Sequence, residues 1–346
     1  MAVAAGAIIS KVRSMYGEHL NERDYSELLR KRSVGEIAGY LKQETHYREA
    51  LRNVRENNVH RGQLEDILRK DLFRELVRLY RYADSKDEAY YHLFIEEVEI
   101  DVILHILRML ISGRIQDAIA ELPVFMREYF SYDLMKMGTV RSYDDLLDVV
   151  EKTYYHKVLL PFRVNKGRED NIDYAGCEAA LIRAYYDRLI REVQRSMSGV
   201  LRKDLLEMHT LDIELNNLAK IFRFKRYYNV SQEVVMESLV PVEGRLRKST
   251  IMEMVNAADD QTFQKLLAQS RYHLRFEEED NIDIEWYMDN IRYQNARRKL
   301  YYSQKAPVVF SAYAVLQKNE LTNIIRIIEG VRYQVDSDTI ASMLIY

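Results

Sequence analysis

Apolar residues recur with helical spacing along most of the chain. The stretches 64–80, 181–193 and 285–293 each place leucine, isoleucine, valine and aromatic residues three or four positions apart. This period puts the apolar side chains on one face of a helix. The pattern therefore predicts long amphipathic helices in three separate parts of the chain.

A second helical pattern also occurs three times, and each copy begins with a glutamate. The sequence reads EIDVILHILR from Glu99, ELNNLAKIFR from Glu214 and ELTNIIRIIE from Glu320, so the glutamates are 115 and 106 residues apart. Apolar residues follow each acid at the fourth and seventh positions. Because these positions share one helix face, we expect three equivalent helices.

A third pattern precedes the other two and predicts a helix start. Ser33 is followed three residues later by Glu36, and Ser142 by Asp145, which is the spacing of a capping box. Each copy ends in Thr-x-Tyr, at 45–47 and 153–155. The third copy, around 250–267, is weaker, and Phe263 and Leu267 are expected to take the places of the tyrosine and of the leucine that follows it.

Together the patterns predict an all-α protein built from one unit repeated three times. The expected ranges are 1–118, 119–232 and 233–346, about 110 residues each. Polar stretches at 52–62, 166–173 and 277–283 precede the long helices at equivalent places. This is where a repeated helical unit needs connecting loops.

Composition supports the helical class and argues against a nucleic-acid-binding function. Only 12 of 346 residues are glycine and four are proline, too few for the turns of a β sandwich, barrel or propeller. The net charge of −3 argues against a nucleic-acid partner, since such proteins are usually basic. The single cysteine, Cys177, can form no disulfide within the chain and is expected to be a small core residue.

The sequence offers no catalytic, cofactor-binding or metal-binding residues to name. The text from Gly244 to Ser249 comes nearest to a phosphate-binding loop, but Arg247 occupies the position of the required second glycine. Neither a dinucleotide-binding nor a nucleophile-elbow motif occurs. The eight histidines form no i, i+4 pair, so a surface or core role is expected for each. No apolar run reaches the length of a membrane-spanning helix.

Tyrosine is unusually common, with 26 residues against 10 phenylalanines. Five Tyr-Tyr pairs occur, and the pairs at 227–228 and 301–302 follow basic residues. Alternating aromatic and basic side chains can bind single-stranded nucleic acid. Packing in cores and interfaces is the favoured role, because tyrosine has an apolar ring and a polar hydroxyl.

Several of these residues resemble the C-subunit family of V/A-type ATPases (ATP synthases), the counterpart of the eukaryotic V-ATPase d subunit. The resemblance begins with the N-terminal text at 12–29 and the Thr45-His-Tyr47 motif. It is strongest from Pro307 to Gly330, with Ala312-Tyr313, Lys318-Asn-Glu320 and Ile325-Arg-Ile-Ile328. Asn319 replaces the first acid of the family's usual pair, and Val331 replaces a lysine.

The resemblance implies three helical domains around a pseudo-threefold axis, forming a funnel or socket. It implies a non-catalytic rotor subunit on the cytoplasmic side of the membrane. The partners would be the central shaft of the soluble catalytic sector and the membrane proteolipid ring, and the subunit would transmit torque between them. No cofactor, nucleic acid or small-molecule substrate is implied, and the residues that meet each partner are not assigned.

Two other functions share the predicted fold. The chain could be a helical-repeat scaffold for soluble protein partners, which would be favoured if the three units stacked in an open row. It could also bind single-stranded nucleic acid through the cluster that contains Arg223, Lys225 and Arg226. An enzyme is disfavoured because no constellation of catalytic residues can be named.

Overall fold

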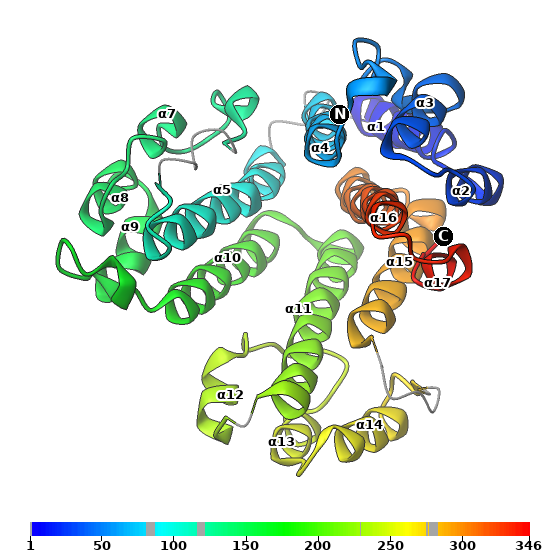
Figure 1. Ribbon diagram of the computed structural model, residues 1–346. Helices are drawn as coiled ribbons and strands as arrows, with labels where there is room; N and C mark the ends of the chain where they lie inside the picture. The colour runs from blue at the N-terminus through cyan, green and yellow to red at the C-terminus, as the bar shows by residue number, and fades with distance from the viewer. Residues whose placement is uncertain (1, 81–86, 116–121, 229, 275, 277–282) are drawn as a thin grey trace. The chain divides into compact units, whose positions relative to one another are not determined.

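The structure is all helical, as the sequence predicts. The computed structural model describes residues 2–80, 87–115, 122–228, 230–274, 276 and 283–346 (Figure 1). Every regular element in these ranges is an α-helix or a short 3-10 helix. Proline lies where a helix tolerates it: Pro307 is in the first turn of a long helix, where its missing N–H costs no hydrogen bond.

Contacts within the chain divide it into two compact units. Unit 1 joins Met1–Ser85 with Glu277–Tyr346, and unit 2 is Lys86–Phe276. Each unit combines segments from more than one of the ranges expected from the repeat, 1–118, 119–232 and 233–346. The three-domain division and its pseudo-threefold arrangement stay predictions.

Unit 1 is organised around one long buried helix, α16. Its elements are α1 (Ala2–Tyr16), α2 (Glu22–Leu29), α3 (Val34–Glu44), η1 (His46–Arg48), η2 (Glu56–Asn58), α4 (Arg61–Tyr80), α15 (Ile284–Tyr302), α16 (Ala306–Arg332) and α17 (Ser337–Ser342). Helix α16 packs against α15, α1 and α4, and also contacts α2, α3 and α17. Apolar residues from both ends of the sequence thereby form one core, which includes Leu28, Leu41, Leu68, Ile324 and Ile327.

Unit 2 contains three long helices with short helices between them. Its elements are α5 (Glu88–Ile111), η4 (Val124–Met126), α7 (Leu134–Met137), α8 (Tyr143–Val149), α9 (Tyr154–Leu159), η5 (Leu160–Phe162), η6 (Glu169–Asn171), α10 (Tyr174–Ser196), α11 (Gly199–Tyr227), α12 (Gln232–Ser238), α13 (Lys248–Asn256) and α14 (Asp260–Gln269). Helix α5 packs along α10, α10 contacts α9 and α11, and α11 contacts α14. Cys177 is fully buried in the core that α5 and α10 share, so its expected core role is confirmed.

The predicted helix starts form with closely similar geometry in both units. The Ser33 hydroxyl accepts the backbone N–H of Glu36 at 3.2 Å, and the Ser142 hydroxyl accepts that of Asp145 at 3.2 Å. Both N-cap contacts of the capping-box prediction are therefore confirmed. In a standard capping box the acid accepts the backbone N–H of the serine. Here Glu36 and Asp145 accept instead the backbone N–H of the residue before the serine, at 2.9 Å in both cases.

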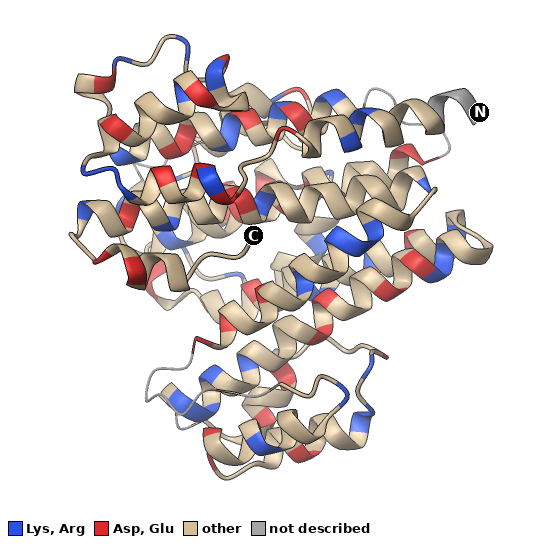
Figure 2. Cartoon of the chain, turned by 90° about the vertical axis from the view of Figure 1, so that its right-hand side faces the viewer, with Lys and Arg blue, Asp and Glu red and all other residues tan. Residues whose placement is uncertain are grey.

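Acidic and basic side chains are interspersed along the helices (Figure 2). The interspersion agrees with the near-neutral net charge of −3. No helix in the described part of the chain carries a run apolar enough to cross a lipid bilayer.

Candidate functional site

The three glutamates of the repeated helix pattern are all buried. Glu99 lies on α5, Glu214 on α11 and Glu320 on α16, and each exposes no more than 3% of its surface. A buried carboxylate is costly unless hydrogen bonds satisfy it. Each of the three receives hydrogen bonds from the short-helix segment that follows it in the repeat, and for Glu320 that segment is at the start of the chain.

The Glu320 cluster is the richest of the three. The Glu320 carboxylate accepts hydrogen bonds from the Leu20 backbone N–H at 2.7 Å and from the Tyr47 hydroxyl at 2.8 Å. His46 Nε2 lies 2.8 Å from Oε1, and His19 Nδ1 lies 3.3 Å from Oε2. The two imidazole rings are nearly parallel, with centroids 5.7 Å apart. One side chain of α16 thus joins α16 to the segment 19–47.

The Glu99 cluster has the same plan, with a serine in place of the histidines. Glu99 accepts hydrogen bonds from the Tyr155 hydroxyl at 2.6 Å and from both the backbone N–H and the hydroxyl of Ser131. The Tyr132 hydroxyl donates to the backbone carbonyl of Glu99 at 2.8 Å. Glu99 therefore joins α5 to the segment 131–155.

The Glu214 cluster completes the series. Glu214 accepts the backbone N–H groups of Arg245 at 3.2 Å and Leu246 at 2.9 Å, and the Tyr272 hydroxyl at 2.5 Å. Gly244 lies against the same carboxylate, since a Cβ placed there would be 2.2 Å from Oε2. The stretch that comes nearest to a phosphate-binding loop therefore binds a glutamate of its own chain.

A recurring local turn aims each tyrosine at its glutamate. Thr45 and Thr153 each accept the backbone N–H of the tyrosine two residues on, at 3.3 and 3.2 Å. Ser270 does the same for Tyr272 at 3.2 Å. The structure corrects the expectation that Phe263 would take the tyrosine position: Phe263 lies in the core within α14, and Tyr272 supplies the hydroxyl.

The Glu320 cluster favours an ionised carboxylate. Burial by itself would raise the pKa of Glu320, but the charges of His19 and His46 and the hydrogen bond from His46 outweigh burial, so this pKa lies below its ordinary value. Burial also acts to lower the pKa of His46, yet the bond to Glu320 raises it overall. Burial lowers the pKa of His19. These shifts favour an ionised Glu320 and a protonated His46, whereas burial acts against a charge on His19.

In the Glu99 cluster the pKa of the glutamate is shifted in the opposite direction. Burial raises the pKa of Glu99, although the hydrogen bonds from Tyr155 and Ser131 act in the other direction. Its hydrogen-bonding partners among the described residues are neutral. The same residue type at equivalent places thus has different electrostatics because its partners differ.

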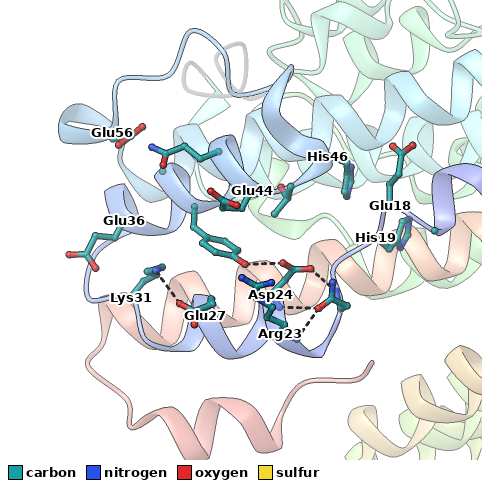
Figure 3. Close-up of a pocket in the computed structure, with 16 residues that line it drawn as sticks. Glu18, His19, Arg23, Asp24, Glu27, Lys31, Glu36, Glu44, His46 and Glu56 are labelled. Atoms are coloured by element: carbon teal, nitrogen blue, oxygen red, sulfur yellow. Dashed lines mark hydrogen bonds and ion pairs between the residues drawn. The ribbon is translucent and has the colours of Figure 1, made fainter.

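An open polar pocket of about 1270 Å³ lies beside the Glu320 cluster (Figure 3). Its acidic lining residues outnumber its basic ones, Arg23 and Lys31. The acids are Glu18, Asp24, Glu27, Glu36, Glu44 and Glu56. Tyr40 donates to Asp24 at 2.8 Å, and Lys31 pairs with Glu27 at 3.8 Å. His19 and His46 also border the pocket, so the cluster can be reached from it.

A second group of ligand-type side chains includes His46. Carboxylate oxygens of Asp71 and Glu75, one turn apart on α4, and a ring nitrogen of His46 all lie within 4.8 Å of one another. The sequence analysis names no metal-binding residue and does not bring these three residues together. Its signal in the sequence is the i, i+4 spacing of the two acids, which does not reveal His46 because that residue belongs to a different element.

The tyrosine pairs divide into packed and exposed sets. Tyr90, Tyr154 and Tyr186 contact other side chains: Tyr90 bonds to His209 at 2.7 Å, and Tyr186 to Asp212 at 2.7 Å. The pairs 227–228 and 301–302 end α11 and α15 and are exposed. Arg226, in the cluster considered for nucleic acid, forms an ion pair with Asp260 at 3.0 Å, which reduces the positive charge available to a phosphate.

The described part of the chain is all helical, and three buried glutamates join its long helices to segments of short helices. The family of the ATP synthase (C/AC39) subunit matches residues 8–343. The chain belongs to this family of V/A-type ATPase subunits, which confirms the resemblance seen in the sequence. A comparison with curated proteins finds no significant match. Family membership implies assembly in an ATPase complex.

Proposed function

We propose that the chain is the central-stalk rotor subunit that joins the shaft of the soluble catalytic sector to the membrane proteolipid ring. It would transmit torque for proton or sodium transport coupled to ATP hydrolysis or synthesis, and would itself catalyse no reaction. Its place would be peripheral, on the cytoplasmic side of the membrane. The observation that carries the proposal is the family match over residues 8–343.

The internal construction supports a mechanical role. A part that transmits torque must keep its helices in fixed register under load. Each of the Glu99, Glu214 and Glu320 clusters ties a long helix to a distant segment by several hydrogen bonds to one buried carboxylate. Such contacts lose their hydrogen bonds if the segment slides by even one residue, so they resist shear.

The order of these contacts is also the order expected of a closed repeat. Helix α5 holds the segment 131–155, α11 holds 245–272, and α16 holds 20–47. The last long helix in the chain, α16, therefore binds the first segment of short helices, 20–47. A repeat stacked in an open row would leave its first and last elements without partners of this kind.

The test is reconstitution of the ATPase complex with and without this chain. A V/A-type ATPase depleted of the chain should still hydrolyse ATP in its soluble sector but should lose ATP-driven ion uptake in vesicles. Adding back the purified chain should restore uptake and place the chain with the shaft and the ring on purification. A depleted complex that pumps at the native rate would overturn the proposal.

A further inference from the structure

The group formed by His46, Asp71 and Glu75 has the composition of a metal site. It combines one imidazole with two carboxylates, and one ligand atom from each lies within 4.8 Å of the other two. His46 is on η1, whereas Asp71 and Glu75 face the same way from consecutive turns of α4. Two carboxylates one turn apart on a helix repel each other when both are ionised, and a cation bound between them would relieve this repulsion.

Each of the three side chains has a ligand atom available. Tyr313 and Gln317 of α16 both donate to Oε2 of Glu75, which leaves Oε1. Glu320 binds Nε2 of His46, which leaves Nδ1. Within the described residues the Asp71 carboxylate accepts no hydrogen bond and forms no ion pair, although the side chain is half-buried.

An independent observation concerns Gln317, which lies next to Glu75 with only 3% of its surface exposed. Its amide nitrogen bonds to Glu75, but its carbonyl oxygen has no hydrogen-bond partner among the described residues. A buried carbonyl without a partner costs about 1–3 kcal/mol. Turning the amide over would bring this oxygen to the Glu75 side, where a cation would satisfy it.

We propose that His46, Asp71 and Glu75 bind a divalent transition-metal ion, for which Zn²⁺ is the best fit. An imidazole nitrogen favours zinc over magnesium or calcium, which prefer all-oxygen sites. Three protein ligands leave the fourth tetrahedral position for water or for the Gln317 carbonyl. Closing the three ligand atoms onto Zn²⁺ requires movements on the order of 1 Å, within reach of flexible carboxylate side chains.

The surrounding residues already serve as an outer shell. A ligating histidine usually donates its other N–H to a carboxylate, which fixes the ring and its tautomer. Glu320 holds this position for His46, while Tyr313 holds Glu75 at 2.9 Å. Zn²⁺ would replace the proton on Nδ1 of His46 and leave the bond from Nε2 to Glu320 in place. The ion would link η1 and α4 and so reinforce unit 1, whatever the function of the chain.

The test is calorimetric titration of the metal-stripped, full-length chain with ZnCl₂. We expect one site with a dissociation constant in the micromolar range or tighter. Asp71→Asn should weaken binding at least tenfold, and it should fold normally because no described residue donates a hydrogen bond to this carboxylate. The matched control is Asp66→Asn on the same helix, an exposed acid paired with Lys70. It should leave Zn²⁺ affinity unchanged.

Two further readouts separate a built site from nonspecific binding. Co²⁺ should give the visible absorption of a tetrahedral ion with the native chain and lose it with Asp71→Asn. Saturating Zn²⁺ should raise the melting temperature by about 5 °C, whereas Mg²⁺ at the same concentration should not. The proposal is overturned if the native chain binds no Zn²⁺ below about 100 μM, or if the Asp71 and Asp66 variants bind it equally well.

Discussion

The Glu320 and Glu99 clusters solve the same structural problem with different electrostatics. Each glutamate lies on a long helix and accepts a tyrosine hydroxyl and a backbone N–H from a segment of short helices. Glu320 also contacts two histidines, whereas Glu99 receives a further hydrogen bond from a serine hydroxyl. The pKa is lowered in the first cluster and raised in the second.

Some hydrogen-bond donors to the buried glutamate recur in every cluster, whereas others differ between clusters. The tyrosine and the backbone donor recur in all three clusters, including Tyr272 and Leu246 at Glu214. These contacts fix the position of a short segment on a long helix. The remaining partners differ from one cluster to the next. Those of Glu320 lower its pKa in spite of burial, whereas burial prevails at Glu99 and raises its pKa.

The largest expected effect comes from removing the charge of Glu320. Glu320→Gln should lower the free energy of unfolding by about 3–5 kcal/mol, because it breaks the buried pair with His46 and disturbs the hydrogen bonds of Tyr47 and Leu20 to the same carboxylate. Glu99→Gln should cost only about 1–2 kcal/mol, since it disturbs hydrogen bonds to neutral donors. Urea unfolding followed by circular dichroism measures both.

The matched control for this pair is Glu329→Gln on the same helix as Glu320. Glu329 is partly exposed and pairs with the partly exposed Arg61, so its replacement should cost less than about 1 kcal/mol. Equal losses for Glu320→Gln and Glu99→Gln would show that the histidines do not distinguish the two clusters.

A smaller effect should follow from adding one methyl group beside Glu214. In Gly244→Ala the new Cβ would lie 2.2 Å from the Glu214 carboxylate oxygen, so the loop or the carboxylate must shift. We expect a loss of about 1–3 kcal/mol in the free energy of unfolding. Gly62→Ala is the control, because no described atom lies within 4 Å of its added Cβ. A Gly244 variant as stable as the Gly62 variant would contradict the close packing.

The smallest effect is a pH dependence that arises from Glu99. Because the pKa of Glu99 is higher in the folded chain than in the unfolded one, the folded chain holds this proton more tightly. Its contribution to stability is therefore present at low pH and is lost as the pH rises from about 4 toward 7. Glu99→Gln removes this titration.

The measurement is urea unfolding of the native chain and Glu99→Gln at several pH values in this range. The stability of the native chain relative to the variant should fall as the pH rises. A relative stability that increases with pH would mean that the hydrogen bonds of Tyr155 and Ser131 dominate over burial.

The helical class and the three glutamates could be predicted from the sequence, because both depend on local patterns. Helical spacing of apolar residues requires only neighbours along the chain. Ser33 and Ser142 are recognisable as helix starts because an N-cap acts within four residues. Glu99, Glu214 and Glu320 occupy aligned positions, but their burial could not be derived from alignment.

The third tyrosine was missed for a physical reason. Phe263 matches the apolar pattern of the other copies and was expected at the tyrosine position. The hydroxyl group that reaches Glu214 comes instead from Tyr272, after a Ser-x-Tyr turn. A serine and a threonine make the same hydrogen bond in this turn, which literal matching of residue letters does not show.

The sequence by itself determined the helices, their caps and the recurrence of one acid, since these follow from contacts within a few residues. Only the tertiary structure decided which segment each acid holds, and it paired Glu320 near the end of the chain with Tyr47 near its start. It also brought His46 to Asp71 and Glu75. Such pairings depend on chain closure over long separations, which no local pattern encodes.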